Sequence, residues 1–293
     1  MTRSGFVSVV GRPNVGKSTL VNALVGQKVA ITSPRPQTTR NTVRGVLTLP
    51  DEDAQIVFID TPGLHKPKNA LGERLNHLVS GSLKDADAVL FVLDATQKIG
   101  PGDRLIAERL RQAGSPVVVV VNKIDLASKE QIAEHLLEAG EWDFAAYVPT
   151  SATEGAGLDA VVTELVDLLP DGPFYFPPDM RTDQPDRLLA AELIREKYLA
   201  RLREELPHSL AVVVDEMETR PNGTLYAAAT IYVERDSQKG MVIGKGGRLI
   251  SVVGREAREE METVFGAPVY LDLRVKVEKD WQRRDALLDR LGF

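Results

Sequence analysis

The sequence has 293 residues and no cysteine, which excludes disulfide bonds, thiolate metal sites and a cysteine nucleophile. No apolar run approaches the roughly 18–20 residues that a membrane-spanning helix needs. No signal peptide is expected, because Gly5 already opens the first predicted strand. The net charge of −6 means that a nucleic-acid partner would need a local basic patch on an acidic protein.

The length and the proline distribution predict two domains. Five of the 17 prolines lie between residues 170 and 185, where neither a helix nor a central strand can continue. We therefore expect a first domain at 1–171, a stiff and partly docked linker at 172–185, and a second domain at 186–293. The alternative is a single domain in which this segment is a long surface loop.

The first domain alternates strand-like and helix-like segments, and two of its apolar runs, 89–93 and 117–121, are hydrophobic at every position. Such runs are typical of strands covered by helices on both faces, so we predict an α/β domain with a mostly parallel sheet. The predicted strands are 6–10, 42–49, 55–60, 88–94, 117–122 and 147–149. The predicted helices begin near Lys17, Ala70, Pro101, Lys129 and Leu158.

The second domain has a segregated pattern that predicts a small α+β fold. A helix at about 186–205 precedes two strands, at 211–218 and 225–234, joined by a turn at 221–223. A glycine-rich turn, a helix at 248–265, a strand at 268–277 and a last helix ending near Leu291 follow. We expect Trp281 to be a packing residue of that last helix.

A phosphate-binding loop is predicted at 11–18, where the sequence fits G-x-x-x-x-G-K-[ST] between an apolar strand and a helix. Its backbone amides and the N-terminus of the helix would cradle phosphates, Lys17 would reach the β- and γ-phosphates, and Ser18 would bind Mg²⁺. The residues expected at the nucleotide are Gly11, Arg12, Pro13, Asn14, Val15, Gly16, Lys17, Ser18 and Thr19.

Three further motifs follow in order, each at the end of a predicted strand. Asp60-Thr61-Pro62-Gly63 can hold Mg²⁺ through water with Asp60 and meet the γ-phosphate with the Gly63 amide. Asp125, in Asn122-Lys123-Ile124-Asp125, can accept both donors of a guanine edge, which adenine does not offer as a pair. Asn122 can brace the loop, the Lys123 stem can lie along the base, and Ser151-Ala152 can offer an amide to guanine O6.

In this order the four motifs resemble the translation-factor-related GTPases, over the first 170 or so residues. The resemblance implies binding of GTP with Mg²⁺, hydrolysis to GDP, and a threonine at 37–40 that closes on Mg²⁺; Thr39 is our first choice and Thr38 the second. Leu64 stands where many such GTPases carry a water-orienting glutamine, and His65 is a weak candidate base. The resemblance also suggests a K⁺ ion near Asn14.

The second domain carries Gly244-Lys245-Gly246-Gly247 in an order of elements that resembles a type II KH domain, over about 190–277. A G-x-x-G turn lets a nucleic-acid backbone approach closely, and charges beside it bind phosphates. Basic and acidic residues are equal in number from 195 to 293, but 237–255 contains only basic ones. The residues expected at RNA are Lys239, Val242, Ile243, Gly244, Lys245, Gly246, Gly247, Arg248 and Ile250.

Together these features resemble the bacterial Era family of GTPases over essentially the whole chain. The resemblance implies a monomeric switch that binds the 3′ region of 16S ribosomal RNA and assists assembly of the 30S subunit. It also implies a cytoplasmic protein with some peripheral association with the inner membrane. Two alternatives remain open: an RNA-binding module in which GTP is structural, and a GTPase whose second domain docks a protein.

Overall fold

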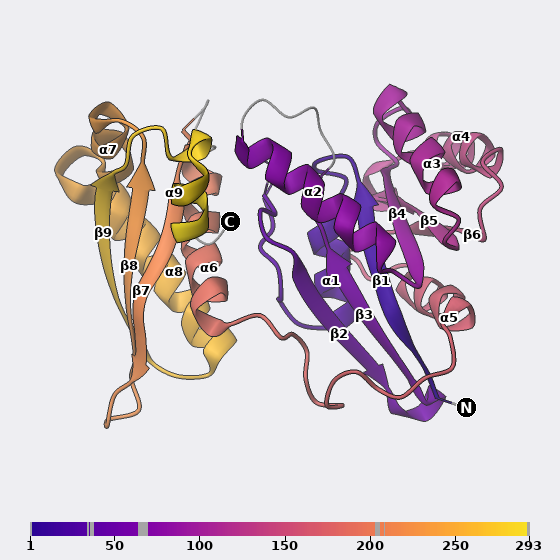
Figure 1. The fold of residues 1–293 in the computed structure, drawn as a ribbon, viewed down its shortest axis with the longest axis horizontal. Coiled ribbons are helices and arrows are strands. Elements are labelled where there is room, and N and C mark those ends of the chain that lie inside the picture. Colours follow the sequence, from indigo (N-terminus) through magenta and orange to yellow (C-terminus); the bar gives the residue numbers. More distant parts are fainter. Residues whose placement is uncertain are drawn as a thin grey trace. The chain divides into compact units, whose positions relative to one another are not determined.

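The computed structural model describes residues 2–33, 35, 38–63, 70–202, 206–207 and 209–291 (Figure 1). The chain forms two compact units. The first contains Met1–Ala30, Thr39–Lys66 and Leu75–Asp183. The second contains Ile31–Thr38, Pro67–Arg74 and Gln184–Phe293, so two short segments from the first half of the chain pack with the second half. In the described part of the chain, no helix is both long and apolar enough to span a bilayer.

The first unit is built on a six-stranded sheet in the order β2-β3-β1-β4-β5-β6. All neighbouring strands run parallel except β2, which is antiparallel to β3. The strands are β1 (Arg3–Gly11), β2 (Val43–Leu49), β3 (Ala54–Asp60), β4 (Ala88–Asp94), β5 (Val117–Asn122) and β6 (Ala146–Thr150). The chain order reverses around β1, so the ends of β1, β3 and β4 meet at the point where open α/β sheets bind ligands.

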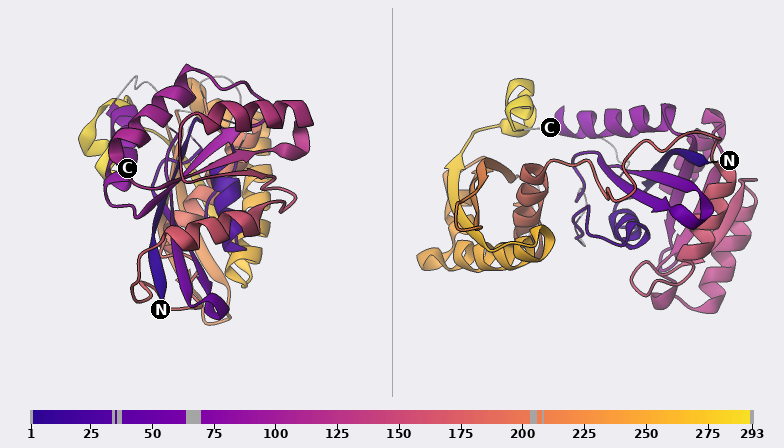
Figure 2. Two further views of the ribbon diagram at one scale, coloured as in Figure 1. Left: turned by 90° about the vertical axis from the view of Figure 1, so that its right-hand side faces the viewer. Right: turned by 90° about the horizontal axis from the view of Figure 1, so that it is seen from below.

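Helices cover both faces of this sheet (Figure 2). Leu90 and Val92 of β4 join the core under α1 (Lys17–Val25) and α5 (Leu158–Leu168). Phe91 and Leu93, which point the other way, join the core under α3 (Pro101–Ala113) and α4 (Lys129–Gly140). The alternation explains why β4 is apolar at nearly every position, as predicted for a strand buried on both faces. The helices of the second face are α2 (Ala70–Lys84), α3 and α4.

The second unit packs helices against a three-stranded sheet in the order β7-β8-β9. β7 and β8 are antiparallel with a bulge between Val214 and Glu216, whereas β8 and β9 are parallel. Val253, Ala257 and Met261 recur every four residues along α8 and are fully buried in this core. The elements are α6 (Asp186–Arg201), β7 (Ala211–Thr219), β8 (Leu225–Val233), α7 (Asp236–Ile243), α8 (Arg248–Phe265), β9 (Val269–Val277) and α9 (Asp285–Arg290). Short 3-10 turns are η1 (Pro50–Glu52), η2 (Ile124–Leu126), η3 (Lys245–Gly247) and η4 (Trp281–Arg283).

Two details of the second unit differ from the sequence prediction. The helix expected to reach Glu205 ends at Arg201, because Leu202 adopts an extended backbone and turns its side chain into the core; residues 203–205 lie outside the described part. Trp281 lies in η4, ahead of the last helix. Its packing role is as expected, since it is fully buried and its indole Nε1 donates to the Ser209 carbonyl at 3.1 Å.

One buried glutamine makes several of the hydrogen bonds that dock the proline-rich segment on the first unit. The Gln55 side-chain oxygen accepts from the amides of Tyr175 (2.8 Å) and Phe176 (3.0 Å). Its nitrogen donates to the Phe176 carbonyl and to Thr48 Oγ1, both at 2.9 Å. Gln55 thus replaces the backbone partners that a proline-rich segment cannot find in a ladder.

We predict that Gln55→Leu detaches this segment while the sheet stays folded, because leucine fills a similar space but offers no hydrogen bond. Hydrogen exchange at the amides of Tyr175 and Phe176 should accelerate by about tenfold or more. Thr48→Val is the matched control, since it removes one partner of Gln55 and leaves both of those amides bonded. Unchanged exchange in Gln55→Leu would show that other contacts hold the segment.

Candidate functional site

The predicted phosphate-binding loop joins the end of β1 to the start of α1 and has the backbone its sequence requires. Asn14 and Gly16 both have positive φ angles, 67° and 99°. A Cβ on Gly16 would lie 2.4 Å from the side-chain nitrogen of Asn122, so only glycine fits there. Gly63 is equally close-packed, since its Cβ would lie 2.8 Å from the Pro13 nitrogen. The phosphate-binding loop is therefore closely packed on two sides, against Asn122 and against Gly63.

Lys17 lies folded into this loop. Its ammonium donates to the carbonyls of Gly11 (3.2 Å) and Arg12 (2.9 Å), and the side chain is buried. Burial lowers the pKa of Lys17 to about 8, although the nearby Asp60 charge opposes the change. Because burial makes its proton easier to lose, an anionic ligand that stabilises the ammonium is favoured at this position.

The three predicted metal-binding side chains come together at the end of β3. Ser18 Oγ donates to Asp60 Oδ2 at 2.6 Å and lies 2.9 Å from Thr39 Oγ1, which is 3.3 Å from the same carboxylate oxygen. Burial raises the pKa of Asp60, and the hydrogen bonds from Ser18 and Thr39 and the charge of Lys17 only partly oppose this. Asp60 Oδ1 is buried and has no hydrogen-bond partner among the described residues. Oxygen donors with a spare carboxylate oxygen fit a hard cation such as Mg²⁺.

Thr38, the second choice for the switch threonine, is not part of this cluster. Its hydroxyl donates to the Arg35 carbonyl at 2.7 Å. Between the two threonines the structure therefore brings only Thr39 to Ser18 and Asp60. Gln37, Leu64 and His65 lie outside the described residues, so the predictions about them are not addressed by the geometry.

Asn122 ties the base-binding loops to the phosphate loop. Its Nδ2 donates to the Val15 carbonyl at 3.0 Å, and its Oδ1 accepts from the Ala152 amide at 3.1 Å and from Thr150 Oγ1 at 3.2 Å. Asp125 is oriented in turn by Ser151, whose hydroxyl donates to Asp125 Oδ1 at 2.6 Å. The bracing role predicted for Asn122 thus has a concrete set of partners.

Asp94, at the end of β4, is a site residue that the sequence reasoning missed. Lys123 Nζ lies 2.6 Å from Asp94 Oδ2 and donates to the Asn14 carbonyl at 2.7 Å. Burial alone would raise the pKa of Asp94, but hydrogen bonds from Lys123 and Thr96 outweigh it and hold the pKa below its usual value. The signal was present, because a carboxylate ending an apolar strand needs a buried partner.

Arg12 and Thr19 contribute less directly. The Arg12 guanidinium turns toward the start of α3, where it pairs with Asp103 at 2.9 Å and donates to Gln97, so its carbonyl is the part that faces Lys17. Thr19 lies in the first turn of α1.

In the second unit, the Gly244–Gly247 turn joins α7 to α8. Gly244, Gly246 and Gly247 have φ angles of 77°, 60° and 75°, which favour glycine. A Cβ on Gly244 would meet Leu249 at 2.7 Å, whereas nothing lies within 4 Å of one on Gly246 or Gly247. The latter two glycines are therefore open to an approaching backbone, and Lys245 and Arg248 beside them are exposed.

A groove of about 330 Å³ lies beside this turn, between α8 and β9. One wall repeats every four residues along α8, with Ile250, Gly254 and Arg258, and Leu271 and Leu273 of the edge strand form the other. Ser251 and Arg255 complete the lining. Of these lining residues, only Ile250 was predicted to contact RNA, because the packing of α8 against β9 is a tertiary feature that sequence does not show.

Three other residues expected at RNA take different places. Val242 is fully buried in the core of the second unit, which corrects the expectation that it lines the groove. Its burial fixes α7 against the sheet and so positions the turn that follows. Ile243 and Lys239 are half-buried, and neither contributes to the groove lining.

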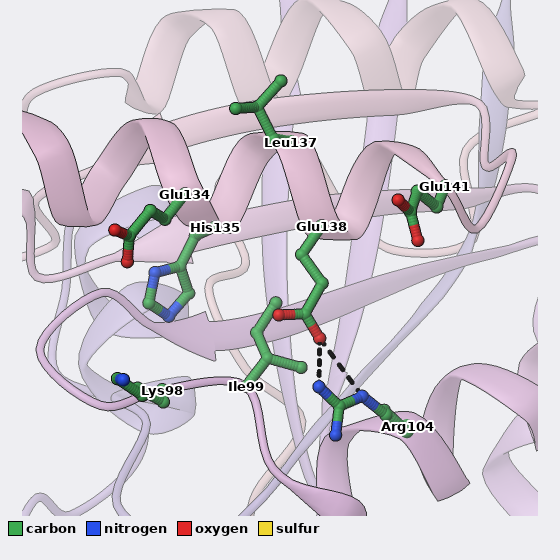
Figure 3. Close-up of a pocket in the computed structure, with 8 residues that line it drawn as sticks. All are labelled: Lys98, Ile99, Arg104, Glu134, His135, Leu137, Glu138 and Glu141. Atoms are coloured by element: carbon green, nitrogen blue, oxygen red, sulfur yellow. Dashed lines mark hydrogen bonds and ion pairs between the residues drawn. The ribbon is translucent and has the colours of Figure 1, made fainter.

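A further cavity of about 530 Å³ opens between α3 and α4, away from all these motifs (Figure 3). His135 lies buried at its edge, with Nδ1 2.7 Å from the Gln131 carbonyl and Nε2 2.7 Å from the Gln97 carbonyl. Arg104 and Glu138 pair at 2.6 Å across the opening. The histidine joins α4 to the loop that follows Asp94, so we regard this region as structural support.

Comparison with known proteins matches both units. Residues 6–123 match the family described as 50S ribosome-binding GTPase, and residues 205–282 match the KH domain. GTPase Era of Alkaliphilus metalliredigens is 48% identical over 295 residues, covering 99% of both chains. GTPase Era of Mycolicibacterium smegmatis is 51% identical over 297 residues, again with 99% coverage of both. The chain belongs to the Era family of GTPases.

Solved Era structures agree with this assignment. Era in complex with MgGDPNP and nucleotides 1506–1542 of 16S ribosomal RNA superposes with a TM-score of 0.95 at 41% identity, covering 100% of this chain and 99% of that one. Aquifex aeolicus Era bound to GDP and AlF4⁻ gives 0.94 at 42% identity, with 99% coverage of both. The predicted fold, a P-loop GTPase domain followed by a KH domain, is confirmed, and as an Era family member the protein is a GTPase.

The environment of Lys17 predicts a pH-dependent nucleotide affinity. In the free protein the ammonium loses its proton near pH 8, whereas a bound polyphosphate raises the pKa and keeps the proton in place. GDP binding should therefore weaken as the pH rises above 8, approaching tenfold for each pH unit.

The comparison protein is Lys17→Met, which keeps most of the stem and loses the charge. Titrations with GDP from pH 7 to 9.5 should give weaker binding for Lys17→Met at pH 7 but no break near pH 8. Deprotonation of the guanine base of GDP at high pH would weaken binding to both proteins by the same factor. Parallel pH profiles for the two proteins would contradict this role of Lys17.

Proposed function

We propose that this protein is a GTP-driven switch that binds the 3′ region of 16S ribosomal RNA and assists assembly of the 30S subunit. The observation that carries the proposal is the presence, in one chain, of a braced phosphate loop beside Ser18, Thr39 and Asp60 and of an open KH groove. It is supported by the likeness to the Era structure with MgGDPNP and 16S ribosomal RNA nucleotides, which matches the whole chain. Binding of GTP in one unit would then time the binding of RNA in the other.

In the GTP site, each side chain has one task. Lys17 contacts the β- and γ-phosphates, and Asp125 selects guanine through its paired donors. Ser18 and Thr39 would ligate Mg²⁺, and Asp60 would hold its water shell with the carboxylate oxygen that has no hydrogen-bond partner among the described residues. The bound Mg²⁺ neutralises charge that develops on the phosphate oxygens. Thr39 would approach the γ-phosphate as well as Mg²⁺, so its contacts would differ between the GTP and GDP states.

The attacking water must be oriented without a glutamine, since residue 64 is leucine. The remaining candidates are the backbone, the loop at Thr38 and Thr39, and a partner molecule. Separately, a K⁺ ion near Asn14 would add positive charge at the β- and γ-phosphates. The position of Asn14 in the phosphate-binding loop supports a K⁺ site there, because a hydrogen bond from Lys123 already holds the Asn14 carbonyl oxygen in place.

We therefore predict faster single-turnover GTP hydrolysis in K⁺ than in Na⁺ at equal ionic strength, by about tenfold or more. Asn14→Gly should abolish the difference, because glycine keeps the positive φ angle and removes the side chain. The GDP affinity of Asn14→Gly serves as the control for an intact loop. Equal hydrolysis rates in the two salts would rule out the ion.

RNA binding is assigned to the groove between α8 and β9 and to the turn beside it. Gly246 and Gly247 let the RNA backbone approach closely, and Lys245 and Arg248 supply positive charge for its phosphates. The aliphatic side chains of the groove pack against the RNA bases. The basic residues are concentrated within 237–255, so the site suits a few phosphates of a single strand.

The test of the proposed function is RNA affinity in two nucleotide states. A fragment of the 3′ end of 16S ribosomal RNA should bind more tightly to the protein with a GTP analogue than with GDP. By linkage the same RNA should tighten binding of the analogue by the same factor. Equal affinity in the two states would refute the switch, and absence of RNA binding would favour a protein partner for the second unit.

Ser251→Glu should weaken RNA binding on the order of tenfold at moderate salt, because it places a negative charge in the groove lining. Thr263→Glu is the matched control, with the same change at an exposed hydroxyl residue of α8 outside the groove. Neither change touches the GTP site. Equal RNA affinities for the two variants would place the RNA elsewhere.

The remaining implications of the family resemblance stay predictions. They are a monomeric state, a cytoplasmic location and peripheral association with the inner membrane. The domain boundaries at 171–172 and 185–186 are likewise proposals. The first unit extends to Asp183, which supports a linker that is docked on the first domain.

A further inference from the structure

An exposed aromatic stack lies on the sheet of the KH unit, on the face opposite its helices. Tyr226 of β8 and Tyr270 of β9 are direct cross-strand neighbours, with ring centroids 5.9 Å apart and an angle of 22° between the ring planes. Arg220 lies in the turn between β7 and β8, and its guanidinium is 4.3 Å from the centre of the Tyr226 ring and 5.5 Å from that of Tyr270. Two aromatic rings and one planar cation therefore form a single stacked group.

The register of the sheet explains why these rings are open to solvent. Side chains alternate between the two faces of a strand. Ala227 and Leu271 belong to the core formed with α6, α7 and α8, so Tyr226 and Tyr270, which precede them, lie on the other face. Tyr270 is 57% exposed. A cross-strand pair that served only to hold β8 against β9 would gain more from burying this ring.

The stack lies near the end of the groove that is farther from the glycine-rich turn. β9 is an edge strand of the three-stranded sheet (Figure 1), and on its core side Leu271 lines the groove together with Arg258 of α8. The carboxylate of Glu262 accepts from Arg258 at 2.8 Å and from the Val269 amide at 3.2 Å, which fixes this end of the groove at the start of β9. An RNA strand that leaves the groove past Leu271 therefore meets Tyr270 once it crosses the edge of β9.

The charges on this face of the sheet favour an approach of RNA from the side of β9. Arg274 and Lys276 lie farther along the same face of this strand, and both are exposed. The carboxylate of β9, Asp272, pairs with Arg274 at 3.0 Å. Glu216 and Glu218 lie across the sheet, on β7. A strand of RNA that crosses the edge of β9 can thus reach the rings without passing the carboxylates of β7.

We propose that Tyr270, supported by Tyr226 and Arg220, is a stacking site for an unpaired base of the RNA strand that leaves the groove. Every nucleobase has a flat face, and RNA-binding proteins stack unpaired bases on aromatic rings and guanidinium planes. None of the residues that the structure describes along the groove is aromatic. The charge of Arg220 is placed to meet the phosphate of the stacked nucleotide. This inference rests on the RNA-binding function proposed above.

The test compares RNAs that do and do not extend beyond the groove. The short RNA, from the 3′ region of 16S ribosomal RNA, has about four nucleotides, the number that a G-x-x-G turn holds. Two longer RNAs carry several more nucleotides, one at the 5′ end and the other at the 3′ end. The natural protein should bind one of the longer RNAs about tenfold more tightly than the short one, since a stacked base contributes that much. Equal affinities for all three RNAs would overturn the proposal.

Tyr270→Leu should remove this gain. Leucine keeps an apolar side chain against Tyr226 but has no flat face, so affinity for the longer RNA should fall about tenfold while affinity for the short RNA stays the same. Tyr270→Phe keeps the ring and should bind both RNAs as the natural protein does. Tyr175→Leu is the matched control, with the same change at an exposed tyrosine of the first unit. If Tyr270→Leu bound the longer RNA as tightly as the natural protein, the rings would serve only the sheet.

A fluorescent purine whose emission is quenched by stacking reports the contact directly. Placed in turn at each position outside the groove, it should be quenched at one position by the natural protein and by Tyr270→Phe. Arg220→Ala, a change at an exposed turn residue, should reduce this quenching. It should also lower the slope of log affinity against log salt concentration by about 0.7, because one phosphate contact is lost. These measurements decide the proposal even if Tyr270→Leu does not fold, and quenching at no position would contradict it.

Failure of this inference can be told apart from failure of the proposed function. If the natural protein binds the short RNA, and the changes at Tyr270 and Arg220 leave binding of the longer RNAs unaltered, only the stacking site is refuted. If the natural protein binds none of the RNAs, the proposed function and the stacking site are both refuted.

Discussion

The side chain of Asn122 is the interaction on which the GTP site depends. The phosphate loop is a strained turn with positive φ angles at Gly11, Asn14 and Gly16, and such a turn needs partners that hold it in shape. Asn122 bonds the Val15 carbonyl with its nitrogen and the Ala152 amide with its oxygen, so one planar group fixes the loop and the guanine-side strand end together. Lys123, the next residue, makes a similar link, because its ammonium donates both to the Asn14 carbonyl and to the Asp94 carboxylate. Base recognition and phosphate recognition are thus parts of one hydrogen-bonded frame.

Sequence alone could predict most of this frame, because its parts are local motifs at the ends of strands. The phosphate loop and the three motifs that follow it at strand ends need only spacing and chain order to be recognised. It could not give Asp94 as the partner of Lys123, since both residues follow apolar strands and many pairings were possible. The groove was harder still. Val242 looked like a wall residue from its position beside the turn, but helical spacing turns it into the core, and Leu271 and Leu273 become wall residues only once β9 pairs with β8.

The charges of the second unit show how an acidic protein can bind RNA. Basic and acidic residues balance from 195 to 293, but many of the acidic ones are engaged in pairs along α6 and α8, such as Glu256 with Arg201 and Glu262 with Arg258. Around the turn at Gly244–Gly247 no carboxylate is present from 237 to 255. Local positive potential over a few phosphates is what single-strand binding needs, and it does not require a basic protein.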